Sequence, residues 1–210
     1  METAFPLLFA AVVGFTHAFE VDHLLAVSSI VTRRRSVWES AKDGVYWGLG
    51  HTSTILAIGL LMIMARVAIT DAAFGYFEAG VGLMLVILGV HRMVKTWQHE
   101  RYHQQAHHQH EPHNHRLAYG VGLVHGLAGS GALVLAVMAN LKSSFDGIAY
   151  LLVFGAGSIA GMLLASGVFS LPFSRKLNLS QGARSMLTVL SSLLCIALGV
   201  KVIWENLYGA

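Results

Sequence analysis

The sequence predicts an all-α polytopic membrane protein with six transmembrane helices, arranged as two inverted three-helix repeats. Three observations lead to this prediction. Only 12% of the 210 residues are charged and 55% are hydrophobic, whereas a soluble domain has about 25% charged residues. Apolar segments of about 20 residues, the length that crosses a bilayer as a helix, recur along the chain. Short sequence motifs also occur in the same order in the two halves.

The first predicted span contains several histidines and acids, and the second contains one histidine. The third and the last are uninterrupted. The fifth is rich in glycine and alanine, as closely packed membrane helices often are. The N-terminal segment has no basic residues before its apolar stretch and runs straight into polar residues, so we expect a retained helix rather than a cleaved signal peptide. The predicted spans are 4–31, 45–69, 73–95, 117–140, 147–171 and 184–205.

The repeat is visible in three pairs of segments, of which GLGHTSTI (48–55) and VFGAGSIA (153–160) align loosely. GFTHAFEVDHLLAV (14–27) aligns with GLVHGLAGSGALVL (122–135), which matches His17 to His125. VILGVHRMVKTW (86–97) aligns with IALGVKVIWEN (196–206). Three spans per half force the second half to insert upside down, an architecture typical of transporters with a site between the halves. We therefore expect one repeat at 1–97, a second at 117–210, and a linker between them.

Lysine and arginine predict the orientation, because they concentrate in cytoplasmic connections. Of the 14 such residues, only Arg66, Lys142 and Lys201 fall on the side that carries the termini. We expect a multi-pass protein of the plasma membrane with both termini outside and the central linker in the cytoplasm. The net charge of +3 reflects this topology. Nucleic acid is not an expected partner, since no basic stripe with interleaved aromatic residues is present.

The strongest functional signal is the polar cluster of His17, Glu20, Asp22 and His23 within the first span. A charged residue at the bilayer centre costs about 2.5–3.5 kcal/mol on insertion scales, so intramembrane ionisable residues indicate function. On a straight helix His17, Glu20 and His23 share one face, whereas Asp22 lies on the far side. Either Asp22 orients a histidine of another helix as a hydrogen-bond acceptor, or the first span is bent at the site.

Two more histidines, His51 and His125, lie in the second and fourth spans. With a rise of 1.5 Å per residue, His23, His51 and His125 lie roughly 9–12 Å from the cytoplasmic ends of their spans, and His17 lies about 21 Å in. Imidazole with carboxylate suits divalent ions such as Ni²⁺, Co²⁺, Zn²⁺ or Cu²⁺. The alternatives are hydrogen-bonded interior histidines at 51 and 125, and a purely structural polar network in the first span.

The segment 98–116, QHERYHQQAHHQHEPHNHR, holds seven of the 12 histidines. Such a composition predicts a flexible linker that binds metal loosely. A solvated spacer is the alternative. The histidines concerned are His99, His103, His107, His108, His110, His113 and His115.

These motifs resemble the nickel/cobalt transporter family. The H-x4-D-H pattern of His17, Asp22 and His23, and LGHTST around His51, are similar to its signature regions. VHGLAGSGAL (124–133), the chain length and the His-rich connection look most like its short branch of urease-accessory membrane proteins. Where the family pattern has a first aspartate, Glu20 stands here, and larger members have more spans.

The resemblance implies transport of Ni²⁺ or Co²⁺ as cargo, with no resident cofactor, and a requirement for the H-x4-D-H residues. We expect uptake that supplies a nickel enzyme such as urease. The expected partners are the divalent ion, the lipid bilayer, and cytoplasmic metallochaperones or urease accessory proteins.

Three other functions are compatible with parts of the sequence. The family includes exporters, so the direction of transport stays open. His17, Glu20 and His23 could hold a catalytic zinc in an intramembrane hydrolase, but the H-E-x-x-H spacing is absent, and we do not expect an enzyme. A haem carrier with axial histidines is the third alternative. No Walker motif indicates ATP hydrolysis by this chain.

Overall fold

The computed structural model describes residues 4–31, 36–65, 70–102, 115–127, 143–173 and 179–209. Within these ranges the chain is all-helical, which confirms the predicted class. The helices are α1 (Ala4–His17), α2 (Val21–Val31), α3 (Val37–Ala65), α4 (Asp71–Tyr102), α5 (Arg116–His125), α7 (Ser144–Ser170) and α8 (Gln181–Tyr208), with a short 3₁₀ turn, η1 (Leu171–Phe173).

Two of the long helices begin with a serine that caps the helix. Ser143 accepts a hydrogen bond from the backbone N–H of Asp146 at the start of α7 (3.2 Å). Ser180 accepts one from Ala183 at the start of α8 (3.3 Å). A serine at this position satisfies one of the free N–H groups at a helix start, which stabilises the helix by about 1 kcal/mol.

Four of the described helices, α3, α4, α7 and α8, are long and apolar enough to cross a membrane. The pair α1 and α2 passes the same test together, so the described part of the chain holds up to five spans. Of the predicted fourth span, 117–140, the structure describes α5 and the two residues after it; the remainder lies outside the described residues. The chain is therefore a multi-pass membrane protein.

The first predicted span, 4–31, is a bent pair of helices rather than one straight helix. α1 and α2 are inclined by 54° across the break that follows His17. At this break Phe19 N donates to Thr16 O and Glu20 N donates to His17 O, both at 3.0 Å. These i to i−3 hydrogen bonds form a 3₁₀-type turn at the end of α1. Glu20 O then accepts a hydrogen bond from Leu24 N at the start of α2 (2.9 Å).

Two other boundaries differ from the predicted spans. α3 begins at Val37 rather than at residue 45, and α4 continues through Tyr102 into the segment predicted as linker. The predicted limits followed the apolar residues. A helix can continue beyond the apolar segment because its backbone hydrogen bonds are made within the helix, whichever side chains face the water.

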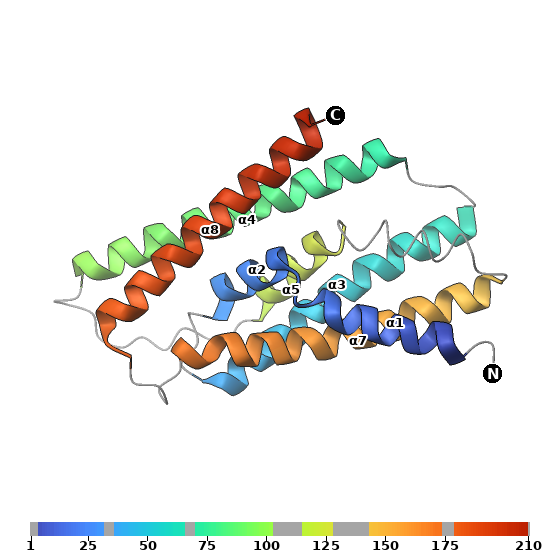
Figure 1. Cartoon of the computed structure of the whole chain (residues 1–210), viewed down its shortest axis with the longest axis horizontal. Coiled ribbons are helices and arrows are strands. Elements are labelled where there is room, and N and C mark those ends of the chain that lie inside the picture. Colours follow the sequence, from blue (N-terminus) through green and yellow to red (C-terminus); the bar gives the residue numbers. More distant parts are fainter. Residues whose placement is uncertain are drawn as a thin grey trace.

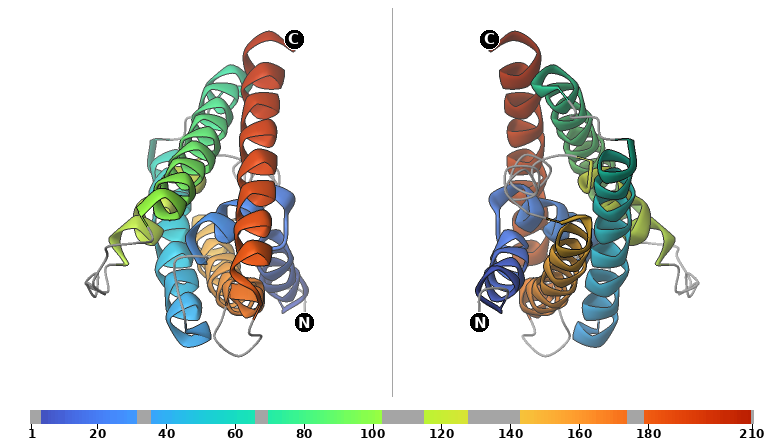
Figure 2. Two further views of the ribbon diagram at one scale, coloured as in Figure 1. Left: turned by 90° about the vertical axis from the view of Figure 1, so that its left-hand side faces the viewer. Right: turned by 90° about the vertical axis from the view of Figure 1, so that its right-hand side faces the viewer.

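The helices pack in two antiparallel pairs, α4 with α8 and α3 with α7 (Figure 1). The direction of the first pair follows from Gly82, which packs on Gly199, and Gly89, which packs on Ser192. α1 lies beside α7, and α5 lies beside α3. The end-on views in Figure 2 show α4 and α8 close together at the top of each view and diverging below. The short helix α2 contacts both pairs, through α3, α4, α7 and α8.

Glycines permit a close contact between α5 and α3. A Cβ atom on Gly122 would lie 2.8 Å from Trp47 Cδ1 and 3.0 Å from the backbone nitrogen of His51. A Cβ on Gly126 would lie 2.9 Å from Thr54 Cβ. Small residues of this kind let membrane helices approach closely, and here they bring His125 of α5 alongside His51 of α3.

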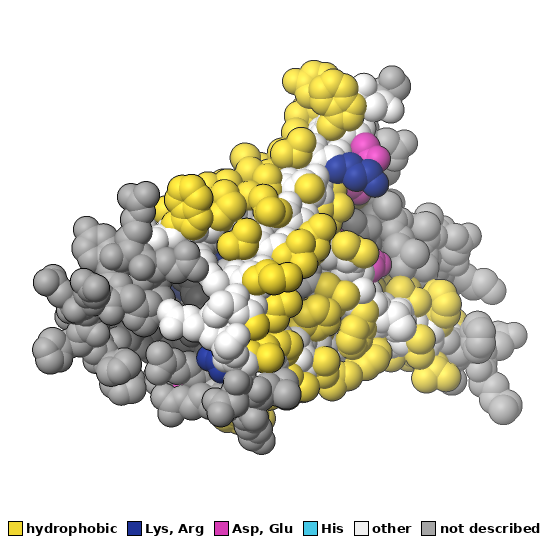
Figure 3. Space-filling model, turned by 60° about the vertical axis from the view of Figure 1, so that its left-hand side comes forward, with side chains coloured by type: hydrophobic (Ala, Val, Ile, Leu, Met, Phe, Trp, Pro, Cys, Tyr) yellow, Lys and Arg dark blue, Asp and Glu magenta, His cyan; other side chains and the backbone are white. Residues whose placement is uncertain are grey.

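Hydrophobic side chains cover much of the described surface on the face shown in Figure 3. Many large ones are exposed, including Leu190, Leu193 and Trp204 on α8. By contrast, the four histidines of α1, α2, α3 and α5 are all buried. An apolar outer surface with ionisable side chains buried inside fits a lipid surrounding.

Candidate metal centre

Four imidazole rings from four helices meet inside the bundle. The ring of His23 lies 4.4 Å from that of His17, 5.4 Å from that of His51 and 4.0 Å from that of His125, centroid to centroid. His17 and His51 stack at 5.4 Å with an interplanar angle of 30°. His23 is therefore the centre of the cluster, and the structure brings together the four histidines that the sequence singled out as candidate ligands.

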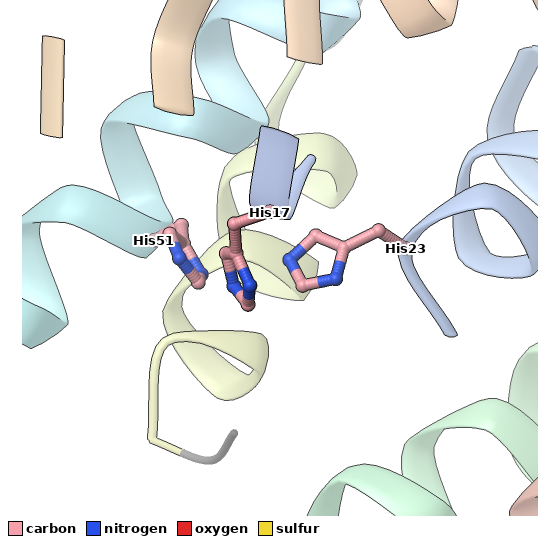
Figure 4. A group of neighbouring side chains, drawn as sticks. All are labelled: His17, His23 and His51. Carbon is pink, nitrogen blue, oxygen red and sulfur yellow. The ribbon is translucent and has the colours of Figure 1, made fainter. Parts of the chain in front are cut away.

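Two sets of side chains have the spacing of a metal site. In the first, His17, His23 and His51 each offer a ring nitrogen within 4.8 Å of the others. Figure 4 shows these three side chains turned toward one another. In the second, Asp22, His23 and His125 offer one ligand atom each within the same distance. Because His23 belongs to both sets, they form one continuous centre.

Carboxylates hold three of the four rings. His17 Nδ1 lies 2.8 Å from Glu20 Oε1. His23 Nδ1 lies 3.2 Å from Asp22 Oδ1, and His125 Nε2 lies 2.9 Å from Asp22 Oδ2. A ring N–H that donates to a carboxylate fixes the tautomer and the direction of the other nitrogen, which is the usual arrangement around metal-binding histidines. One aspartate thus orients two imidazoles from different halves of the chain.

The remaining ring nitrogens are buried without a hydrogen-bond partner. They are His17 Nε2, His23 Nε2, His125 Nδ1 and both nitrogens of His51. Leaving one buried polar atom unpaired costs about 1–3 kcal/mol, and most buried polar atoms in proteins are paired. A cluster of unpaired imidazole nitrogens is therefore unfavourable on its own and becomes favourable once it binds a cation.

The C-terminal ends of α1 and α5 favour a positive charge at the site. His17 is the last residue of α1, and His125 is the last residue of α5. The C-terminal end of a helix carries a partial negative charge. Broken membrane helices whose C-terminal ends face a central site are a recurring way to bind cations. The two histidines aligned in the sequence repeat thus occupy equivalent places in their helices.

Aromatic residues that the sequence analysis did not single out enclose the rings. Trp47 stacks on His23 at 5.5 Å and lies 5.7 Å from His125. Phe154 of α7 lies 5.9 Å from His17. Trp47 precedes His51 by four residues and therefore lies on the same face of α3, and this spacing is the signal that could have identified it.

The acids of the first span differ in position. Glu20 has a side chain that is 54% exposed and contacts His17 at the edge of the cluster. Asp22 is 29% exposed and contacts His23 and His125. The straight-helix geometry had placed Glu20 with the histidines and Asp22 opposite. The break after His17 removes that constraint, so Asp22 reaches a histidine of another helix.

Of the histidines predicted in the linker, the structure describes the side chain of His115. Its Nδ1 lies 2.6 Å from Asp43 Oδ1, and its ring stacks on Tyr46 at 4.6 Å. This contact lies at the start of α5, apart from the four-histidine cluster at its end. The side chains of His99, His103, His107, His108, His110 and His113 lie outside the described residues.

Comparison with known proteins finds a related sequence. The chain is 36% identical over 171 residues to the urease accessory protein UreH of Bacillus sp. (strain TB-90), covering 78% of this chain and 75% of the relative. No family model and no solved structure matches the chain. The chain therefore belongs to the urease-accessory branch of the nickel/cobalt transporter family, whose members are membrane proteins and not enzymes.

Proposed function

We propose that this protein transports a divalent transition-metal ion, Ni²⁺ or Co²⁺, across the plasma membrane through the four-histidine centre. His17, His23, His51 and His125 bind the ion, and Asp22 and Glu20 orient the rings. The observation that carries the proposal is the set of buried ring nitrogens that have no protein partner. Neutral imidazole is a good ligand for nickel and for similar ions.

We propose further that residues 1–97 and 117–210 are inverted repeats of three spans each. If the two halves were exchanged, α1 would take the place of α5, and α7 would take the place of α3. The contact of α1 with α7 would then become the contact of α5 with α3, and both contacts are present. The same exchange would swap the two helices within each antiparallel pair, α3–α7 and α4–α8, so both pairs would be preserved. The centre then lies between the halves, as in other transporters with inverted repeats.

The proposed direction is inward, with both termini outside and the segment 98–116 in the cytoplasm. Support comes from the distribution of lysine and arginine and from the relative, whose name links it to urease. A nickel enzyme such as urease would use the imported ion. Cytoplasmic metallochaperones or other urease accessory proteins would receive it, and the His-rich segment would hold ions loosely before that transfer.

The test is metal flux into liposomes that contain the purified protein, with Ni²⁺, Co²⁺, Zn²⁺ and Mn²⁺ compared side by side. We expect Ni²⁺ or Co²⁺ to enter fastest. His51→Ala should abolish entry, since both nitrogens of this ring lack a protein partner. His91→Ala is the matched control because it removes an exposed histidine from α4.

Two results would contradict the proposal. If wild-type protein moved none of the four ions, the proposed transport function would be wrong. Normal flux in His17→Ala, His23→Ala and His51→Ala proteins would leave transport intact but place its path elsewhere. The direction of transport needs a separate measurement. Efflux from metal-loaded liposomes is compared with influx into empty ones, with a proton gradient or membrane potential applied in each direction. The faster of the two fluxes distinguishes an exporter from an importer.

A further inference from the structure

A buried hydroxyl on α7 has no partner within the protein. Ser158 is 0% exposed, and its Oγ makes no hydrogen bond. A serine inside a membrane helix normally donates to a carbonyl one turn earlier. Ser28 and Ser192 do so here at 2.7 Å each, and Ser40 does so at 3.2 Å. Ser158 is therefore an exception that requires an explanation.

The direction of Ser158 follows from its neighbours on α7. Phe154 faces α1, since it lies 5.9 Å from His17. Gly155 faces α3, since its carbonyl accepts from Thr52 Oγ1 (3.3 Å). At 100° per residue, Ser158 points about 40° from Phe154 and about 60° from Gly155, between the two. Its side chain is thus directed at the junction of α1 and α3.

The height of Ser158 along the bundle matches that of two of the histidines. On α1, Gly14 packs on Phe154 and Ala18 packs on Gly161, so His17 lies level with the stretch of α7 between them. On α3, Gly48 packs on Ile159 and Thr52 packs on Gly155. His51 therefore lies level with the stretch 155–159. Both stretches contain Ser158, and the rings of His17 and His51 stack at this level.

We propose that Ser158 is an additional contact of the transported cation, through a hydrogen bond between Oγ and a water molecule that the ion retains. This inference rests on the proposed function and adds an oxygen contact from α7, a helix that contributes none of the four rings. The four rings supply nitrogen alone, and an ion that keeps a water needs a polar partner for it in an otherwise apolar wall. Ser158 supplies that partner.

The test is Co²⁺ binding to the purified full-length protein, since Co²⁺ bound by a thiolate absorbs in the near ultraviolet. Ser158→Cys places a thiol at this position. The softer sulfur displaces the retained water and binds the ion directly, so we expect that absorption band to appear on addition of Co²⁺. Ser192→Cys is the matched control, because Ser192 is equally buried, on α8. It should produce no band beyond the wild-type background.

Ser158→Ala gives the second measurement. We expect Ni²⁺ and Co²⁺ affinity to fall about tenfold, as for the loss of one hydrogen bond to a charged group, with the Ser192→Ala protein as the control. No band from Ser158→Cys together with unchanged affinity in Ser158→Ala would overturn the inference and leave the hydroxyl as the site of an ordinary buried water. If wild-type protein bound no metal, the proposed function itself would fail.

Discussion

Asp22 and His125 are 103 residues apart in the sequence and are joined by a hydrogen bond of 2.9 Å, donated by His125 Nε2. The same carboxylate accepts from His23 Nδ1 through its other oxygen. Asp22 therefore joins a ring of the first half of the chain to a ring of the second half. This bridge holds the two rings in place at the candidate metal centre.

Asp22→Asn should weaken metal binding about 10–100-fold, the usual effect of losing a carboxylate that orients metal-binding histidines. Asparagine has the same shape but one acceptor oxygen, so it cannot hold both rings. Titration of purified protein with Ni²⁺ measures the change. Glu20→Gln is the comparison, because Glu20 contacts one ring and is half exposed. A larger loss from Glu20→Gln than from Asp22→Asn would contradict the bridging role.

Gly122→Leu should lower the thermal stability of the detergent-solubilised protein, by about 1–3 kcal/mol or more. The added side chain meets the backbone of Trp47 and His51, which cannot move aside without separating α5 from α3. Gly120→Leu, two residues earlier on α5, is the control, since a Cβ there has no atom within 4 Å. Equal unfolding temperatures for the two variants would show that the close contact is not needed.

Replacing residues 103–114 with a glycine–serine segment of equal length should reduce the number of metal ions bound but leave the tightest affinity unchanged. The replacement preserves α4 to its end at Tyr102 and the contact of His115 with Asp43. Equilibrium dialysis against Ni²⁺ measures both quantities. Loss of the tight site would instead make the His-rich segment part of the centre.

Cysteine labelling should confirm the orientation. The native Cys195 is the single cysteine and is buried, so it contributes little background, and Cys195→Ser can remove it. In intact cells, we expect a membrane-impermeant maleimide to label Gly209→Cys near the C-terminus. It should label His107→Cys in the linker only after the cells are permeabilised. The reverse pattern would invert the topology and the inferred direction of transport.

The sequence predicted the helical class, and it singled out the four histidines that the structure brings together, because both depend on local composition. Buried histidines in apolar spans indicate a shared site wherever the helices meet. The bend in the first span could not be derived in this way. The break falls at Ala18, Phe19 and Glu20, with no glycine or proline to mark it, and backbone bonds of the i to i−3 type form it.

The roles of the two acids depended on that bend. A straight helix places Glu20 with His17 and His23, whereas the bent pair places Asp22 between His23 and His125. Ser158 was not predicted for a different reason. A serine in a membrane span is ordinary, and its unusual feature, the missing bond to its own helix, is visible only when its neighbours are in place.

The burial of Trp47 against the histidines sets it apart from the other tryptophans. Of the four tryptophans, Trp38, Trp97 and Trp204 are exposed, and Trp47 alone is buried, with its indole against His23 and His125. Ni²⁺ and Co²⁺ have partly filled d shells and quench the emission of an adjacent indole. The protein therefore carries its own optical reporter of occupancy, and with the other three tryptophans changed to phenylalanine, metal arrival and departure could be followed in real time without any added dye.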